Sequence, residues 1–253
     1  MARVLIFLGG KQMNFAKTLK KTLSAFTLAE KLLWLISVAV ILLTFFIFDG
    51  HGLLTPAASL IGVTSLIFNA KGRPFGQFLM IVFSIMYGII SFSFSYYGEM
   101  ITYLGMTAPM ALFALISWIK NPYDKDSREV KVNKISRIET VLMLLLTAAV
   151  TAVFYFILAH FNTQNIIPST VSVTTSFLAV YLTFRRSPFF ALAYAANDAV
   201  LIALWVLASI ADKSYIPVTA CFAVFLINDV YGFVNWQKMK KRQSDNFRNN
   251  ALR

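Results

Sequence analysis

The most restrictive feature of the sequence is its division into long apolar stretches, each bounded by charged residues or proline. A helix needs about 20 apolar residues to cross the core of a bilayer. Eight stretches approach that length: roughly 32–48, 53–70, 74–96, 100–119, 139–160, 168–184, 188–210 and 216–237. Stretches this long are typical of helices rather than of barrel strands. The sequence therefore predicts an all-α integral membrane protein with eight transmembrane helices.

Composition and charge support this class and predict an orientation. A soluble domain of 253 residues could not bury a composition that is 58% hydrophobic. Of the 23 lysines and arginines, all but Lys213 lie in alternate segments between the predicted helices, together with the two ends of the chain. Cytoplasmic loops are enriched in Lys and Arg. We therefore expect a multi-pass protein of a bacterial inner or plasma membrane with both termini in the cytoplasm.

The basic N-terminal arm, residues 1–31, precedes the first predicted helix. Part of it would place apolar residues on one helical face and lysines on another: Phe15, Leu19, Leu23 and Phe26. This pattern is typical of a helix lying on an anionic membrane surface, although a disordered arm is an equal alternative. Thr27 and Glu30 have the spacing of a capping box and predict a helix start.

An internal repeat is indicated by matching segments in the two halves. "KGRPF" joins the second and third predicted helices at Lys71 to Phe75, and "RRSPF" joins the sixth and seventh at Arg185 to Phe189. Trp118 closes the fourth helix as Trp236 closes the eighth. We therefore predict two parallel three-helix units joined by a linker helix, which is an arrangement known from membrane transporters.

The predicted organisation follows from this repeat. An extra helix spans residues 32–50, ahead of the first unit. The predicted units are residues 53–120 and 168–238, the linker helix is 139–161, a cytoplasmic loop spans 121–138 and a basic tail spans 239–253. Pro109 lies inside the fourth helix and should kink it, because proline removes a backbone hydrogen bond.

The last predicted helix carries polar residues that are costly to place in lipid. In the run "FLINDVYGFVNW", Asn228 and Tyr231 share a helical face, and Asp229 lies on a neighbouring one. Polar side chains inside membrane helices face a cavity or another helix. We therefore expect these three to line a substrate path, with helix–helix hydrogen bonding as the alternative.

The seventh predicted helix carries a matching set. Tyr194, Asp198 and Trp205 share one face, and Asn197 lies on an adjoining seam. Aromatic faces stack on a ring and attract positive charge, amides donate and accept hydrogen bonds, and a carboxylate balances a cation. This set indicates a small, flat, polar ligand, for which a positive charge would suit the carboxylates.

The first unit offers milder groups, chiefly Gln77 and Tyr87, so the second unit should supply most of the recognition. In an alternative interpretation, Asp198 or Asp229 is a proton site for ion coupling. The sequence carries no H-E-x-x-H, G-x-S-x-G, C-x-x-C or phosphate-binding-loop pattern, so we expect no enzyme activity, cofactor, catalytic residue or metal. The charge of +12 lies in short loops and tails, which argues against nucleic acid as a partner.

The sequence resembles the bacterial PnuC-type vitamin transporters, which are relatives of the SWEET sugar transporters. The resemblance covers roughly residues 30–240 and rests on the eight-helix layout, on the stretch from Gly98 to Tyr123 and on the ending "NDVYGFVNW". It implies facilitated diffusion of nicotinamide riboside, a precursor of NAD, which a cytoplasmic kinase then traps by phosphorylation. The implied partners are thus a vitamin or nucleoside, the lipid bilayer and, functionally, that kinase; a homo-oligomer is left open.

One departure from the family concerns the substrate. Members that take nicotinamide riboside resemble W-x-x-W-x-x-x-N at the start of the seventh helix, where this chain has Phe190, Ala193 and Asn197. Only the asparagine is kept, so Tyr194 or Trp205 would have to supply the ring-stacking surface. The alternatives are a transporter of thiamine, riboflavin or deoxynucleosides, and a membrane receptor that binds without translocation.

Overall fold

The computed structural model describes residues 26–48, 52–93, 96–123, 129–163 and 165–251, and within them every regular element is helical. The surface helix predicted in the N-terminal arm lies, up to residue 25, outside the described residues. The helices are α3 Leu28–Phe48, α4 Leu54–Ala70, α5 Pro74–Ser93, α6 Tyr97–Thr102, α7 Ala108–Lys120, α8 Arg137–His160, α9 Ile166–Phe184, α10 Phe190–Ala211 and α11 Ile216–Ala251.

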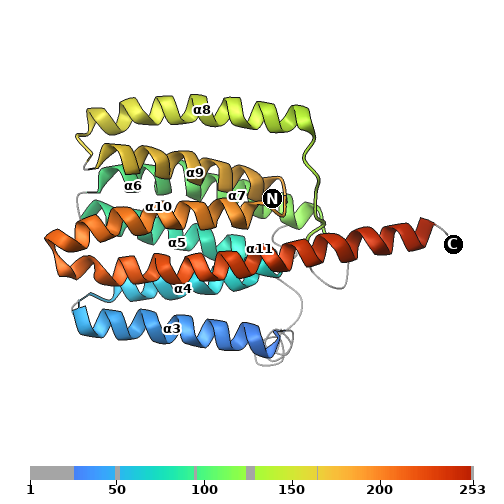
Figure 1. Ribbon diagram of the computed structural model, residues 1–253, viewed down its shortest axis with the longest axis horizontal. Coiled ribbons are helices and arrows are strands. Elements are labelled where there is room, and N and C mark those ends of the chain that lie inside the picture. The colour runs from blue at the N-terminus through green and yellow to red at the C-terminus, as the bar shows by residue number, and fades with distance from the viewer. Residues whose placement is uncertain (1–25, 49–51, 94–95, 124–128, 164, 252–253) are drawn as a thin grey trace, which may run out of the picture.

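These helices confirm the predicted all-α membrane class. Among the described residues, seven spans are long and apolar enough to cross a membrane, with α6 and α7 forming one span together, and α4 is a shorter apolar helix of 17 residues. Their bounds lie within a few residues of the predicted ones, except that α11 continues to Ala251, well past the predicted end near residue 237. Figure 1 shows the helices lying side by side, with the end of α11 projecting beyond the bundle.

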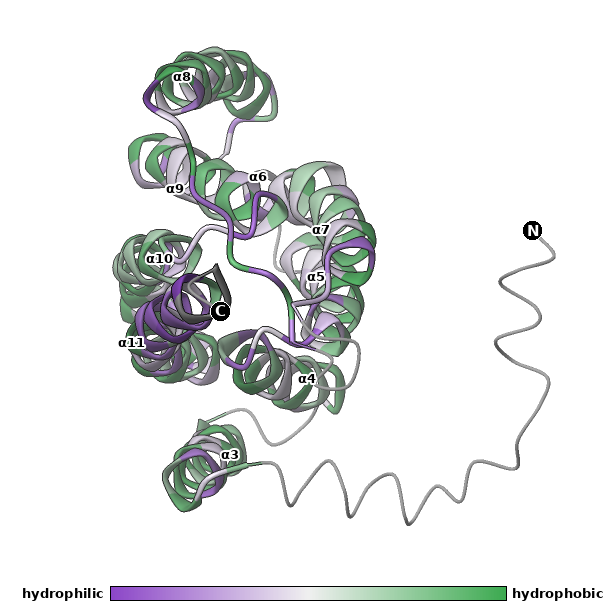
Figure 2. Cartoon of the chain, turned by 90° about the vertical axis from the view of Figure 1, so that its right-hand side faces the viewer, coloured by the Kyte–Doolittle hydropathy of each residue, from purple (hydrophilic) through white to green (hydrophobic). Residues whose placement is uncertain are grey.

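In the described part of the chain, six helices form a closed ring. Going round it, α4 packs on α5, α5 on α7, α7 on α9, α9 on α10, α10 on α11, and α11 back on α4. Figure 2 shows the ring end-on, with α3 outside it against α4 and α11, and α8 outside it against α9. Both outer helices expose large apolar side chains, such as Phe46 on α3 and Phe156 on α8, which suits contact with lipid.

The start of α3 is fixed as its capping pattern predicts. The backbone N–H of Thr27 donates to Glu30 Oε2 at 2.6 Å, and the N–H of Glu30 donates to Thr27 Oγ1 at 3.3 Å. Helix α8 starts with a related cap, in which the N–H of Glu139 donates to Ser136 Oγ at 3.2 Å. Each glutamate also forms a salt bridge to the residue that directly follows a ring helix. Glu30 pairs with Lys71 after α4, and Glu139 pairs with Arg185 after α9. The two outer helices are therefore attached in the same way.

The helix that contains Pro109 is irregular in the turn before the proline. Tyr103–Thr107 forms a π-helical turn between α6 and α7, and Pro109 is in the first turn of α7. Proline has no N–H to donate and its ring crowds the preceding turn, so a wider turn before it relieves both constraints. Thr107 Oγ1 donates to the carbonyl of Thr102 at 3.3 Å and satisfies part of the altered backbone.

The two short turns that suggested the repeat also match in conformation. The second residue of each, Gly72 and Arg186, has φ of +62° and +56° respectively. The left-handed conformation suits glycine, and in Arg186 it is held by a 2.6 Å bond from the guanidinium to Ser117 Oγ. Both turns lie at the end of the bundle from which α11 projects (Figure 1).

Candidate binding site at the centre of the helix ring

A small cavity of about 20 Å³ lies inside the ring. Every helical span of the ring contributes to its wall: Leu66, Met80, Phe83, Tyr103, Thr107, Ser176, Tyr194, Asn197, Asp198, Phe222, Phe225 and Asp229. A volume of this size holds about one water molecule. The cavity therefore marks where the polar residues of the two halves meet, and a ligand of vitamin size requires the walls to move apart.

Asn197 is held in one orientation by α9. Its side-chain oxygen accepts a hydrogen bond from Thr175 Oγ1 at 2.8 Å and another from Ser176 Oγ at 2.9 Å. Both described bonds use the oxygen, so the amide N–H₂ is the group that this arrangement presents as a donor. The side chain is almost fully buried. Asn197 is thus a preorganised donor in the cavity wall.

Two carboxyl groups meet in the same cavity. Asp198 on α10 and Asp229 on α11 are 3% and 4% exposed, and they lie within hydrogen-bonding reach of each other. Oδ2 of Asp198 is buried and has no hydrogen-bond partner among the described residues. Buried carboxyls inside a membrane protein are costly and generally serve function. The sequence placed these two acids on separate helices, and the fold brings them together.

Aromatic rings close most of the remaining wall. Phe83 contacts Tyr103 with ring centroids 6.0 Å apart, and Phe225 with centroids 5.4 Å apart. Phe222 packs on Phe225 at 5.7 Å, and Tyr194 lies beside both acids. The site therefore combines flat apolar faces with a few polar groups, which is the usual composition of a small-molecule site.

An aromatic layer closes the bundle on one side of the cavity. Along α10, Trp205 comes about two turns after Asp198, and its indole N–H donates to the Tyr87 hydroxyl at 2.8 Å. Tyr96 and Tyr215 pack on the same indole, with centroids 4.7 and 5.7 Å away. The Trp205 layer thus contains two predicted site residues, Trp205 and Tyr87, at a level beyond the cavity itself.

A second aromatic layer closes the other side. Trp118, Trp236 and Phe190 are fully buried and mutually in contact, with the two indole rings 5.4 Å apart. The indole N–H of Trp118 donates to the carbonyl of Thr183 at 2.8 Å, and that of Trp236 donates to the carbonyl of Asn69 at 2.8 Å. Each tryptophan therefore ties the last helix of its own half to the first helix of the other half.

The residues before these tryptophans repeat the arrangement. Ser117 Oγ donates to the carbonyl of Phe184 at 3.0 Å, and Asn235 Nδ2 donates to that of Ala70 at 2.7 Å. Under the predicted repeat, the bond of Trp118 corresponds to that of Trp236, and the bond of Ser117 corresponds to that of Asn235. The repeat itself stays a prediction, and these reciprocal contacts support it.

Besides Trp205 and Tyr87, three further predicted site residues lie away from the cavity. Tyr231 donates its hydroxyl proton to Glu30 Oε1 at 3.0 Å, and Asn228 Nδ2 donates to Ser37 Oγ at 3.0 Å, so both face α3. Gln77 Nε2 donates to Asn69 Oδ1 at 2.8 Å inside the α4–α5 hairpin. These contacts match the alternative considered from the sequence, in which polar groups bond one helix to another.

Several wall residues were not singled out from the sequence. Phe83, Tyr103 and Phe225 were not distinguishable from the many other aromatics of apolar helices. Tyr103 and Thr107 belong to the π-helical turn, and such turns often occur at functional sites. Pro109 inside a span was the available signal, because it forces irregular backbone close by.

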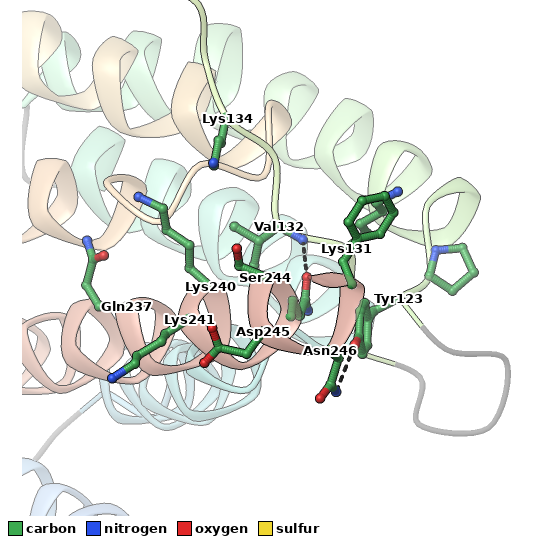
Figure 3. A pocket seen from close by; sticks show the side chains of 13 residues that line it. Tyr123, Lys131, Val132, Lys134, Gln237, Lys240, Lys241, Ser244, Asp245 and Asn246 are labelled. Carbon is green, nitrogen blue, oxygen red and sulfur yellow. Dashed lines mark hydrogen bonds between the residues drawn. The ribbon is translucent and has the colours of Figure 1, made fainter. Parts of the chain in front are cut away.

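A larger hollow of about 1000 Å³ lies outside the ring, between the segment that follows α7 and the projecting end of α11 (Figure 3). Four lysines surround it: Lys131, Lys134, Lys240 and Lys241. The buried side chain of Gln243 joins its two walls, because its Oε1 accepts from the N–H of Val132 at 2.9 Å and its Nε2 donates to the carbonyl of Val130 at 3.1 Å. The hollow shares no residue with the enclosed cavity.

Comparison with known proteins identifies the family. Residues 52–238, well over half of the chain, match the family model described as nicotinamide mononucleotide transporter. The chain belongs to the nicotinamide mononucleotide transporter family. The nicotinamide riboside transporter PnuC of Neisseria mucosa is 25% identical over 240 residues, which cover 93% of this chain and 90% of that protein.

The fold of this nicotinamide mononucleotide transporter family member is shared with a solved structure. The crystal structure of the vitamin B3 transporter PnuC matches with a TM-score of 0.76 at 22% identity, covering 87% of this chain and 94% of that one. The predicted family is therefore confirmed, and with it a multi-pass membrane transporter. The predicted relation to SWEET transporters stays a prediction.

Proposed function

We propose that this chain carries nicotinamide riboside across a membrane by facilitated diffusion. The observation that carries the proposal is the enclosed cavity at the centre of the helix ring, lined by aromatic rings and by Asn197, Asp198 and Asp229. The relative from Neisseria mucosa is named for the same substrate. Substrate sites at the interface of two repeated units are the general arrangement in such transporters.

The proposed roles follow from the groups present. The Asn197 amide donates to a carbonyl or hydroxyl of the ligand, and its position is set by Thr175 and Ser176. Tyr194 and the phenylalanine rings of the wall provide faces on which the nicotinamide ring stacks. Asp198 and Asp229 provide negative charge. Trp205 and Tyr87 act one layer further out, where they close the site.

Transport requires the two aromatic layers to open in turn. The cavity of about 20 Å³ is far smaller than the substrate, so binding and release must separate the halves. At the Trp118 layer, the hydrogen bonds to Thr183 and Asn69 both cross between halves. Separation on that side therefore breaks both together, whereas opening on the Trp205 side leaves them intact. This linkage suits alternating access.

The direction of uptake rests on the charge pattern. We infer that the Trp118 layer faces the cytoplasm, because the basic turns and the projecting end of α11 lie on that side (Figure 1). Substrate released there would be trapped by a cytoplasmic kinase. Trapping supplies the driving force that a passive carrier lacks.

The test is uptake into proteoliposomes. Purified protein reconstituted without any proton or sodium gradient should accumulate labelled nicotinamide riboside to the external concentration and no further. Uptake that requires a gradient would overturn the passive mechanism and assign ion coupling to Asp198 or Asp229. Binding with no flux would instead identify a receptor.

A second candidate is a carrier of thiamine, riboflavin or deoxynucleosides. In this chain, Phe190 belongs to the Trp118 layer and does not line the cavity, and Ala193 packs beside that layer, so neither provides the paired indoles of nicotinamide riboside carriers. The same proteoliposomes should therefore also be given thiamine, riboflavin and deoxynucleosides. Preferential uptake of one of these would replace nicotinamide riboside as the substrate.

A further inference from the structure

The enclosed cavity brings two carboxyl groups together without a basic side chain beside them. Among the residues that line it there is no lysine, arginine or histidine. The salt bridges of the described residues join Glu30 to Lys71, Glu139 to Arg185 and Glu129 to Arg242, and none involves Asp198 or Asp229. Uncompensated carboxyls in a site from which water is largely excluded are unfavourable.

The geometry points the pair at the cavity. Asp198 and Asp229 come from helices α10 and α11, which pack closely side by side, and both groups line the same small space. Asp198 Oδ2 is left without a partner although it is buried, whereas most buried polar atoms in proteins are paired. Aromatic faces of Phe83, Tyr103 and Phe225 surround the same space.

We propose that the Asp198–Asp229 pair selects ligands by charge, so that the site takes a flat heteroaromatic cation and rejects an uncharged ring of the same shape. Carboxyl groups and aromatic faces both attract a cationic ring, and both act more strongly where water is excluded. The inference rests on the proposed function and narrows its substrate class. It assigns the selection between charged and uncharged ligands to the charge of two side chains, and not to contacts that fit the shape of the ligand.

The experiment compares ligands that differ chiefly in charge. Binding of nicotinamide riboside, whose ring is a pyridinium, is measured by calorimetry beside its reduced dihydro form, whose ring is uncharged. A cation–π contact and a desolvated carboxylate predict at least about tenfold weaker binding of the uncharged form. Thiamine and 3-deazathiamine, in which a carbon atom replaces the cationic ring nitrogen, form a second pair of nearly equal shape.

Two variants locate the effect. Asp198→Asn and Asp229→Asn should each lower the affinity for the cation about tenfold or more, while changing that for the uncharged form about twofold or less. Asp245→Asn, an exposed acid on the projecting end of α11, is the matched control and should leave both affinities unchanged. Thermal unfolding of each variant shows whether it remains folded.

The outcomes separate the charge selection from the proposed function. Equal binding of nicotinamide riboside and its reduced form by the unmodified protein would overturn charge selection and leave vitamin B3 transport standing. Preference for thiamine over 3-deazathiamine, without binding of either nicotinamide riboside form, would uphold charge selection and replace the proposed substrate. Failure of every cation to bind would overturn both.

Discussion

Helix α3 should depend on one buried ion pair, and replacing its cation tests this directly. Lys71 Nζ lies 2.9 Å from Glu30 Oε2, and the side chains are 18% and 2% exposed. Tyr231 and the N–H of Thr27 also donate to the same carboxylate. Lys71→Met removes the counter-charge and keeps the length of the side chain, so Glu30 stays buried without a cation.

The magnitude follows from burial. Removing one partner of a buried ion pair costs about 3–5 kcal/mol, and the two remaining donors should reduce this to roughly 2–4 kcal/mol here. The second change Glu30→Gln should recover part of the loss, because an amide oxygen still accepts from Tyr231 and Thr27 without burying a charge. The double variant is therefore expected to be more stable than Lys71→Met alone.

The chain contains its own control in the corresponding pair of the other half. Arg185 and Glu139 are 35% and 20% exposed, so solvent screens their interaction. Arg185→Met should cost about 1 kcal/mol or less. The comparison isolates burial as the variable, because both pairs join an outer helix to the helix behind it.

The assay is thermal unfolding of purified protein, followed by the fluorescence of its four tryptophans. At about 2–4 °C per kcal/mol, Lys71→Met should lower the unfolding midpoint by roughly 4–16 °C, and Arg185→Met by no more than about 4 °C. Equal shifts in the two single variants would refute the reasoning. So would a double variant less stable than Lys71→Met, since the carboxylate would then stabilise the fold without its cation.

Three further variants test the site and its closure. Asn197→Ala should weaken ligand binding about ten- to hundredfold by removing a preorganised amide, and calorimetry showing unchanged affinity would move the site elsewhere. Gly62→Ala would place a methyl group 2.3 Å from Cζ of Phe225, so the phenyl ring must shift. We expect reduced uptake of substrate. Undiminished uptake would contradict the view that the aromatic wall of the cavity is fixed. Trp118→Phe removes the 2.8 Å hydrogen bond to the carbonyl of Thr183, which costs about 1 kcal/mol, and leaves a gap in the Trp118 layer. Leak of small solutes through the protein in the absence of ligand should therefore rise. Vesicles that show no such leak would indicate that the Trp205 layer alone closes the path.

The sequence by itself determined the class of the protein and most of its helices. Apolar stretches of membrane length are local signals, because lipid requires each span to satisfy its own backbone. The capping box at Thr27 and Glu30 is equally local, and the structure confirms it. Grouping of Tyr194, Asn197 and Asp198 was also predictable, because they lie on adjoining faces of one helix.

Which polar groups meet was decided only by the tertiary structure. Helical periodicity fixes the angle between neighbouring side chains, but not how the helix is rotated against its neighbours. In α11 that rotation turns Asp229 into the cavity and turns Asn228 and Tyr231 toward α3, where Ser37 and Glu30 accept their hydrogen bonds. Packing of α3 outside the ring thus converts two candidate ligands into anchors, while the fold pairs Asp229 with an acid on another helix.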